Sequence, residues 1–495
     1  MGTKATAGPA PKRLVVCCDG TWANSATAKP NIPSNVTQIC RSLARSGIAE
    51  DGKVWQQIIY YDAGVGTGDL SKLERLKQGL NVNVIAAYNF LVNNYVQGDE
   101  LFFFGFSRGA YSVRAIAGLV CEIGILAPYE MLLFPQIYAA HKRTLMYDPQ
   151  LSVEDWWAKN IGYLKYRRPR ADVPVKCCAV WDTVGALGLP SERKKLTNHY
   201  RKSYLFHKTA LHPRTILNFN SRLGWADCPV LGIENAFQAL ALDEHRSSFT
   251  PVLCISVGGG DPDSLLPKYK EDHEDIAHIA FAWMVDRVSS LLAFDQDAVM
   301  MALNTRDPGP DSRVGMRDIV RKVHYASSKV KDGATSFIFK LLGLKNRNPG
   351  EFREMMKPQV LLTDLGATNE EIHPSVWFRE VGTNVLPDEN EQPTKAYHSR
   401  ALSDFERVQD SDKGWYWYRS ERRLKRCFSA DLAPLRELKL PEFVIPQKLS
   451  SQPSIERALM EDKKASKRLL RELDAGNGFP VPDGVFEGAN PVTGT

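Results

Sequence analysis

Short apolar runs alternate with longer segments of helical periodicity over the first 300 residues. The apolar runs are RLVVCC (13–18), VWQQIIYY (54–61), LFFFGF (101–106), VKCCAVWD (175–182) and TPVLCISV (250–257). Such runs are typical of strands that are buried on both faces of a parallel sheet. Apolar residues recur at helical spacing in 35–46, 79–97, 110–120 and 274–292, and Ser34 is placed to cap the first of these helices. The alternation predicts an α/β fold, with a mostly parallel central sheet and helices on both of its faces.

The same pattern predicts where the domain ends. We expect one domain over residues 13–293, with less regular helical insertions at about 125–172 and 186–235. From 294 to 445 the strand-like alternation fades and prolines recur, which predicts a mostly helical or irregular C-terminal extension. Residues 446–495 are expected to form a charged helix, at 453–473, and a loose tail.

Composition narrows the class of protein. The chain of 495 residues is 43% hydrophobic and 24% charged, as globular proteins are, and its net charge of +6 gives no indication of nucleic-acid binding. It contains no apolar run long enough for a membrane span and no secretory signal pattern. The nine cysteines form no CxxC pair, so reduced thiols in a cytoplasmic protein are expected. Histidines and cysteines show no metal-ligand spacing, and no cofactor is expected.

Four polar residues stand where predicted strands end. Asp19, Asp62, Ser107 and Asp182 each follow or close an apolar run. Any one of them alone is best explained as a turn or cap residue. Functional residues of open α/β sheets gather at the carboxyl ends of the strands, so four such residues together indicate a site.

The stretch GFSRG (105–109) carries the clearest chemistry. It lies between the apolar run LFFF and a helical segment, which is the context of a nucleophile elbow. Such a strand-to-helix turn exposes the serine hydroxyl, and Gly105 and Gly109 remove Cβ atoms where backbone segments approach closely. Ser107 is therefore the candidate nucleophile.

Acyl transfer also needs an oxyanion hole and a general base that activates the serine. The backbone N–H of Arg108 would be one oxyanion donor, and Gly20 or Thr21 in the stretch DGTW would supply the second. Asp182, at the end of the next clear core strand, is the candidate acid that orients a histidine. An ordinary Asx-type turn at DGTW is the alternative explanation, and it is the less favoured one.

Several motifs in order resemble one family. They are LVVCCDGTWANS, NVTQICRSL, YYDAGVGTG, GFSRGAYSVRAIAGLV, VWDTVGALGLP, ALALDEHRSSFTPVL, VGGG and DIAHIAFAWM, with IHPSVWFR further on. The chain resembles an α/β-hydrolase family of uncharacterised fungal and bacterial proteins, which is similar to the catalytic domain of type VI secretion phospholipase effectors (Tle1-like). The resemblance implies a serine esterase or phospholipase with a Ser-Asp-His triad, in which Ser107 and Asp182 hold the first two places.

The family's histidine has no counterpart at its usual place. The family pattern is approximately WFPGVHSDVGGGY, whereas this chain has TPVLCISVGGGDP, with Cys254 at the histidine's place and Ser256 two residues after it. Three explanations stay open. A nearby histidine substitutes (His273 first, with His278 and His245 as alternatives), the chain is a non-catalytic relative, or the sequence lacks a short segment.

Two hypotheses for function result. The first is a serine hydrolase of carboxylic ester bonds, lipase- or phospholipase-like, acting on an ester or lipid substrate. The second is a catalytically inactive α/β-hydrolase scaffold that binds partners. The basic run YRRPR (166–170), close to Trp156 and Trp157, would suit peripheral contact with anionic lipid headgroups, although a solvated basic face is its ordinary explanation. The oligomeric state is left open.

Overall fold

The computed structural model describes a large part of the central domain and several segments of the extension. The described residues are 11–20, 33–48, 52–63, 72–135, 137–138, 173, 175–183, 233–244, 257–258, 274–303, 347, 349, 370–377, 380, 398–410, 414–420, 438–446, 449 and 454–460.

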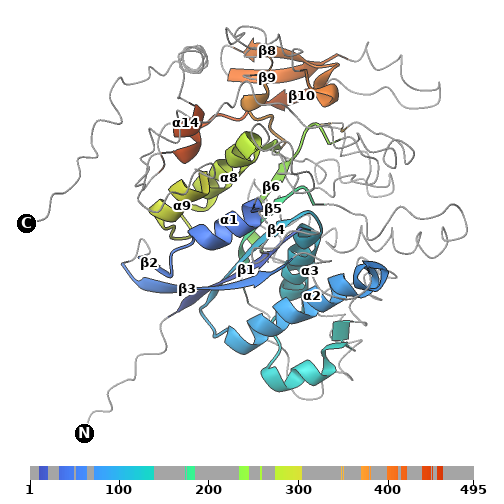
Figure 1. Cartoon of the computed structure of the whole chain (residues 1–495), viewed down its shortest axis with the longest axis vertical. Coiled ribbons are helices and arrows are strands. Elements are labelled where there is room, and N and C mark those ends of the chain that lie inside the picture. Colours follow the sequence, from blue (N-terminus) through green and yellow to red (C-terminus); the bar gives the residue numbers. More distant parts are fainter. Residues whose placement is uncertain are drawn as a thin grey trace, which may run out of the picture.

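A seven-stranded sheet forms the centre of the protein, in the order β2-β3-β1-β4-β5-β6-β7 (Figure 1). Its strands are β1 (Lys12–Cys18), β2 (Ser46–Ile48), β3 (Val54–Asp62), β4 (Glu100–Phe106), β5 (Val175–Trp181), β6 (Ile233–Leu240) and β7 (Val257–Gly258). The edge strand β2 is antiparallel to β3, and the other neighbours are parallel. The predicted mostly parallel sheet is confirmed. β2 and β6 were not predicted, since neither carries a run of consecutive apolar residues.

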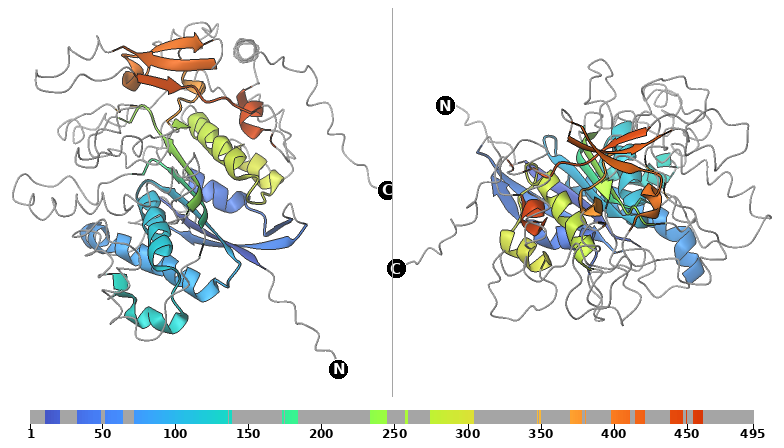
Figure 2. Two further views of the ribbon diagram at one scale, coloured as in Figure 1. Left: turned by 180° about the vertical axis from the view of Figure 1, so that it is seen from behind. Right: turned by 90° about the horizontal axis from the view of Figure 1, so that it is seen from above.

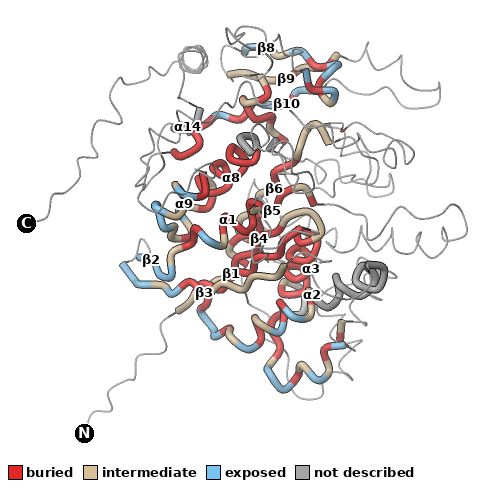
Figure 3. The backbone as a smooth tube through the Cα atoms, viewed as in Figure 1, coloured by how far each residue is buried: buried red, intermediate tan, exposed pale blue. Residues whose placement is uncertain are grey.

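Helices cover both faces of this sheet (Figures 1 and 2). One face carries α1 (Asn35–Ser42), α8 (Glu274–Val288) and α9 (Gln296–Leu303), and the other carries α2 (Lys72–Asn94) and α3 (Ser107–Ile123). Alternate residues of each strand supply the two cores: Phe102 and Phe104 of β4 join the first, and Leu101 and Phe103 the second. The strands β1, β4 and β5 are buried along nearly their whole length for this reason, whereas most of β3 is only partly buried (Figure 3).

The helix α1 begins where the sequence predicts. The Ser34 side chain accepts a hydrogen bond from the backbone N–H of Thr37, as an N-cap residue does. The predicted helices at 79–97, 110–120 and 274–292 correspond to α2, α3 and α8.

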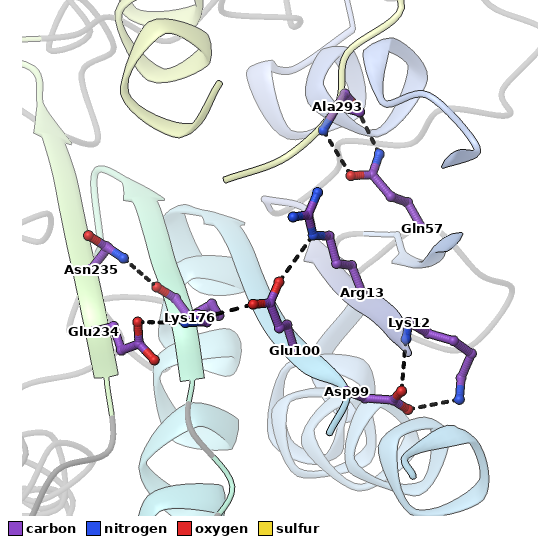
Figure 4. Close-up of polar contacts among 9 residues, drawn as sticks. All are labelled: Lys12, Arg13, Gln57, Asp99, Glu100, Lys176, Glu234, Asn235 and Ala293. Atoms are coloured by element: carbon purple, nitrogen blue, oxygen red, sulfur yellow. Dashed lines mark hydrogen bonds and ion pairs between the residues drawn. The ribbon is translucent and has the colours of Figure 1, made fainter. Parts of the chain in front are cut away.

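Charged side chains join the amino ends of the inner strands (Figure 4). Lys12 pairs with Asp99, and Arg13 with Glu100. Lys176 of β5 then lies 2.9 Å from Glu234 of β6 and 3.7 Å from Glu100. Because these charges pair with one another across neighbouring strands, they have a structural role, and we do not assign a functional site to the amino edge of the sheet.

The C-terminal extension corrects one expectation. Its described residues include a three-stranded antiparallel sheet, β10-β9-β8, formed by β8 (Glu406–Asp410), β9 (Gly414–Arg419) and β10 (Leu438–Pro441). The prediction of a mostly helical or irregular extension missed this sheet. In β9, GWYWYR, aromatic residues follow one another without a polar alternate, so the strand shows no period of two.

An arginine stack fixes this small sheet. The Arg407 guanidinium lies 4.0 Å from the ring centre of Trp377 and 3.7 Å from that of Trp415. Its nitrogens donate to both carboxylate oxygens of Glu442, at 2.6 and 2.7 Å. A planar, bidentate and stacked cation is the arrangement for which arginine is better suited than lysine.

The end of the chain is attached to the central domain through α8. The Asp286 carboxylate accepts hydrogen bonds from the Ser454 hydroxyl (2.7 Å) and the backbone N–H groups of Ile455 (3.1 Å) and Glu456 (3.0 Å). These residues begin the helix α14 (Ile455–Met460), at the start of the predicted terminal helix. The remainder of that predicted helix lies outside the described residues.

The structure also bears on membrane-spanning helices and on the state of the cysteines. Among the described residues, no helix is long and apolar enough to cross a bilayer. The described cysteines, Cys17, Cys18, Cys40, Cys121, Cys177 and Cys178, are free thiols.

Candidate active site

Four polar residues lie along the carboxyl edge of the sheet. Asp62 is the last residue of β3, and Asp19, Ser107 and Asp182 directly follow β1, β4 and β5. Cys18 is in register with Asp62 on one side and with Gly105 on the other, and Phe106 is in register with Trp181. The strand ends that the sequence singled out therefore lie side by side.

The turn at Ser107 has the backbone of a nucleophile elbow. Ser107 has φ 53°, a left-handed conformation that a residue other than glycine adopts at a cost. Gly105 and Gly109 are required on either side. A Cβ on Gly105 would lie 2.6 Å from the Cα of Ala110, and one on Gly109 would lie 2.1 Å from the carbonyl oxygen of Cys18. The strained, half-exposed serine thus stands at the first position of α3.

The turn after β1 packs directly against this elbow. Gly109 faces the carbonyl oxygens of Cys18 and Asp19, and a Cβ on Gly20 would lie 2.4 Å from the Phe106 ring. The backbone N–H of Gly20 donates to its neighbour's carboxylate, Asp19 Oδ1, at 2.7 Å. Thr21, the other candidate donor in this turn, lies outside the described residues.

Asp19 holds the turn after β1 in place through hydrogen bonds to its carboxylate. Its Oδ2 atom accepts hydrogen bonds from the hydroxyls of Ser34, Thr37 and Tyr61, each at 2.8 Å. The carboxylate is 3% exposed, so these donors replace the water that it loses on burial. Asp19 thereby joins the end of β1 to the start of α1 and the end of β3.

The next strand presents Asp182 in a similarly strained turn. Asp182 has φ 40°, and its backbone N–H donates to the Ala239 carbonyl at 2.8 Å. Its Oδ1 atom accepts from the backbone N–H of Ala241 at 2.9 Å and lies 2.9 Å from a terminal nitrogen of Arg347. Burial raises the pKa of the Asp182 carboxyl, and the Arg347 guanidinium opposes that rise.

Two further ionisable groups at this edge are altered by burial. Loss of hydration lowers the pKa of the Arg108 guanidinium to about 10 and raises the pKa of Asp62 to about 6. Within the described segments, Asp62 Oδ2 is buried without a hydrogen-bond partner. Asp62 lies at the end of β3, so β1 separates it from the strand that carries Ser107.

The candidate bases are divided between described and undescribed residues. His273, His245 and Cys254 lie outside the described residues, so their places relative to Ser107 are left as predictions. His278 lies in α8, where it is 7% exposed.

A second serine–histidine–carboxylate group lies in the extension. His373 is hydrogen-bonded to Glu456 through Nε2 and lies 2.7 Å from the Ser375 hydroxyl through Nδ1. His373 and Glu456 are each 1% exposed, and the Ser375 backbone N–H also contacts the same ring nitrogen. Its burial and its local serine turn identify this group as a link between the extension and α14.

Arg347 was not among the residues predicted from the sequence. It lies in the stretch KNRNPG, which has no motif and is far from Asp182 along the chain. Only the packing of the extension against the sheet brings the guanidinium to the carboxylate.

The fold and the edge residues define an α/β protein with a strained serine turn beside a partly buried carboxylate. Comparison with known families shows what one segment of the chain is similar to. Residues 12–256 match the model of the family "T6SS, Phospholipase effector Tle1-like, catalytic domain". The resemblance inferred from the sequence motifs is confirmed for this segment.

Individual relatives are distant. The uncharacterized protein YEL023C of Saccharomyces cerevisiae (strain ATCC 204508 / S288c) is 28% identical over 133 residues, which cover 23% of this chain and 18% of that protein. A structure of the Tle1 effector bound to the VgrG spike of the type 6 secretion system is 16% identical, with a TM-score of 0.27, over 54% of this chain and 51% of the other. An uncharacterized protein from Pseudomonas aeruginosa is 12% identical, with a TM-score of 0.28, over 70% and 57%. The chain thus spans only part of the length of each.

Proposed function

We propose that this protein is a serine hydrolase of carboxylic ester bonds, with a lipid or phospholipid as its substrate. The single observation that carries the proposal is the strained turn at Ser107, which lies at the carboxyl edge of the sheet next to Asp182. The match of residues 12–256 to a phospholipase catalytic domain supports the lipid substrate. The proposal includes an α/β-hydrolase type of fold for residues 13–293 and a cytoplasmic location.

In the proposed mechanism, the Ser107 hydroxyl attacks the ester carbonyl and passes its proton to an imidazole. The N–H of Arg108, at the amino end of α3, stabilises the oxyanion, and the helix dipole favours the same charge. The turn at Gly20 supplies the second donor. The leaving alcohol takes the proton from the imidazole, and water then releases the acid from the acyl-enzyme.

Asp182 is the proposed partner of that imidazole. Its Oδ1 atom is occupied by Ala241 and Arg347, whereas Oδ2 has no hydrogen bond from any described residue. An acceptor held on one oxygen and open on the other is suited to orient an imidazole N–H. His273 remains the first candidate for the base, followed by His278 and His245.

The Gly20 N–H can act as an oxyanion donor only if it becomes available to the substrate. It already donates to Asp19 Oδ1. We propose that it is shared with the oxyanion when the substrate binds, while the three hydroxyl donors keep Asp19 in place. Thr21 is the alternative donor.

The second candidate function is an inactive scaffold that binds partners or lipid. The observation that favours it is Cys254, which occupies the place of the family's histidine. A serine without a general base is a poor nucleophile at neutral pH. Peripheral contact with anionic lipid through residues 166–170 is compatible with either function. Binding to a secretion spike is not part of the proposal.

A fluorophosphonate probe separates the two functions. The intact protein should become labelled near neutral pH, and Ser107→Ala should abolish the labelling. Ser112→Ala is the matched control, because Ser112 lies on the same helix, is buried and donates to the Arg108 carbonyl. Absence of labelling in a folded wild-type protein would reject the hydrolase and leave the scaffold.

A further inference from the structure

A buried cation touches the proposed catalytic acid. Arg347 is 6% exposed, and a terminal nitrogen of its guanidinium lies 2.9 Å from Asp182 Oδ1. Arg347 belongs to the extension, whereas Asp182 follows β5 of the central sheet. Burying a charge this fully costs free energy unless an opposite charge lies close to it.

Asp182 is the only described group that Arg347 is seen to pair with. Within the described segments, the guanidinium Nε and the nitrogen that faces Asp182 have no partner of hydrogen-bond geometry. The 2.9 Å contact is nevertheless an ion pair, in which the guanidinium charge favours the ionised carboxylate. Breaking it would leave an uncompensated carboxylate at this edge of the sheet.

Among the described residues, the groups that face Asp182 come from two parts of the chain. The turn after β6 contributes the Ala241 N–H, which stabilises the carboxylate, and Glu244, whose negative charge opposes ionisation. The extension contributes Arg347. The guanidinium is the one full positive charge among these neighbours, and burial alone would keep the carboxyl protonated to higher pH.

We propose that Arg347 is a positioning residue for catalysis: the extension supplies a guanidinium that holds Asp182 Oδ1, leaving Oδ2 for the imidazole. This inference rests on the proposed hydrolase function. It makes the extension part of the active site, because Arg347 is the described positive charge that reaches Asp182.

The structure predicts a change in pH dependence when Arg347 is replaced. The readout is the second-order rate of fluorophosphonate labelling of Ser107, measured on the full chain from pH 5 to 9. In Arg347→Gln the acidic limb should move to higher pH, because a neutral residue no longer favours the carboxylate. Labelling at neutral pH should fall roughly ten- to a hundredfold, as expected when a catalytic group is misplaced by about 1 Å. Arg347→Lys should keep the acidic limb near its wild-type position, because it keeps the charge.

A double-mutant cycle separates positioning from folding. If Arg347 acts through Asp182, then Arg347→Gln should cause no further loss in the background of Asp182→Asn. An equal loss in both backgrounds, or an unmoved acidic limb in a folded Arg347→Gln protein, would overturn the inference. If circular dichroism shows that Arg347→Gln is unfolded, the same cycle is run with Arg347→Lys, whose smaller loss must also vanish beside Asp182→Asn.

The failures of the two proposals are distinguishable. If the wild type is labelled and Ser107→Ala is not, an unmoved pH profile rejects the role of Arg347 alone. If the folded wild type is not labelled at any pH, the hydrolase and the role of Arg347 are rejected together.

Discussion

Replacing Gly109 by alanine tests the contact between the elbow and the turn after β1. The added Cβ would lie 2.1 Å from the Cys18 carbonyl oxygen and 2.4 Å from that of Asp19. Ordinary contacts begin at 3.4 Å, so the Cys18 oxygen would have to move away by about 1.3 Å. Both obstacles are backbone atoms of a strand end that is hydrogen-bonded on both sides, so no side-chain rotation relieves the clash.

Two consequences should be measurable in Gly109→Ala. Overpacking of a close contact typically costs about 1–3 kcal/mol, so the free energy of unfolding should fall by that amount. The displacement also separates Gly20 from the elbow, and a shift of about 1 Å in a catalytic group can cost a hundredfold in rate. Chemical denaturation would measure the first effect, and the rate of fluorophosphonate labelling the second.

The control is Ala115→Gly, on the same helix. It weakens α3 by about 1 kcal/mol through helix propensity and introduces no clash. We expect it to lower stability while leaving labelling near the wild-type rate. Wild-type stability together with wild-type labelling in Gly109→Ala would refute the close approach of the two turns, and equal labelling losses in both variants would refute its link to the active site.

Three further predictions concern buried carboxylates. Asp19→Ala leaves three hydroxyls without their acceptor and should lower the free energy of unfolding by more than the roughly 1 kcal/mol expected for loss of the cap in Ser34→Ala; equal losses in denaturation experiments would contradict the network. Glu442→Gln leaves the Arg407 charge without its counter-ion, so denaturation should show a loss of about 3–5 kcal/mol, as for other broken buried pairs, and a loss under 1 kcal/mol would show that the stack suffices. Burial raises the pKa of Asp286 to about 6. Between about pH 4 and 6 the Asp286 carboxyl is therefore protonated in the folded protein and ionised in the unfolded chain. This group's contribution to stability therefore decreases as pH rises through that window; Asp286→Asn should flatten the decrease in thermal melts, and an unchanged slope would contradict the shift.

Local pattern was sufficient for several elements of the fold. The runs that became β1, β4 and β5 are almost continuously apolar, because each of these strands is covered on both faces, whereas the run that became β3 includes two glutamines and is only partly buried. Helical periodicity placed α2, α3 and α8, and the cap at Ser34 placed the start of α1. These features depend on neighbours only a few residues apart, so the sequence displays them directly.

The same reasoning missed elements whose stability comes from distant partners. β6 is a mixed strand, IENAFQAL, that pairs with β5, which lies far from it along the chain, and with the short strand β7. The small sheet β10-β9-β8 depends on an arginine stack whose members come from three separate segments. No local period marks either element.

In the candidate site, too, some features follow from the local sequence and others from tertiary contacts. The sequence by itself determined that Asp19, Ser107 and Asp182 stand at strand ends and that glycines flank the serine, because a tight turn restricts the residues next to it. Only the tertiary structure decided that Gly109 meets the backbone of β1, that three hydroxyls converge on Asp19 and that Arg347 reaches Asp182. A buried charge selects its partner by proximity in space, and that proximity arises only when the extension packs against the sheet.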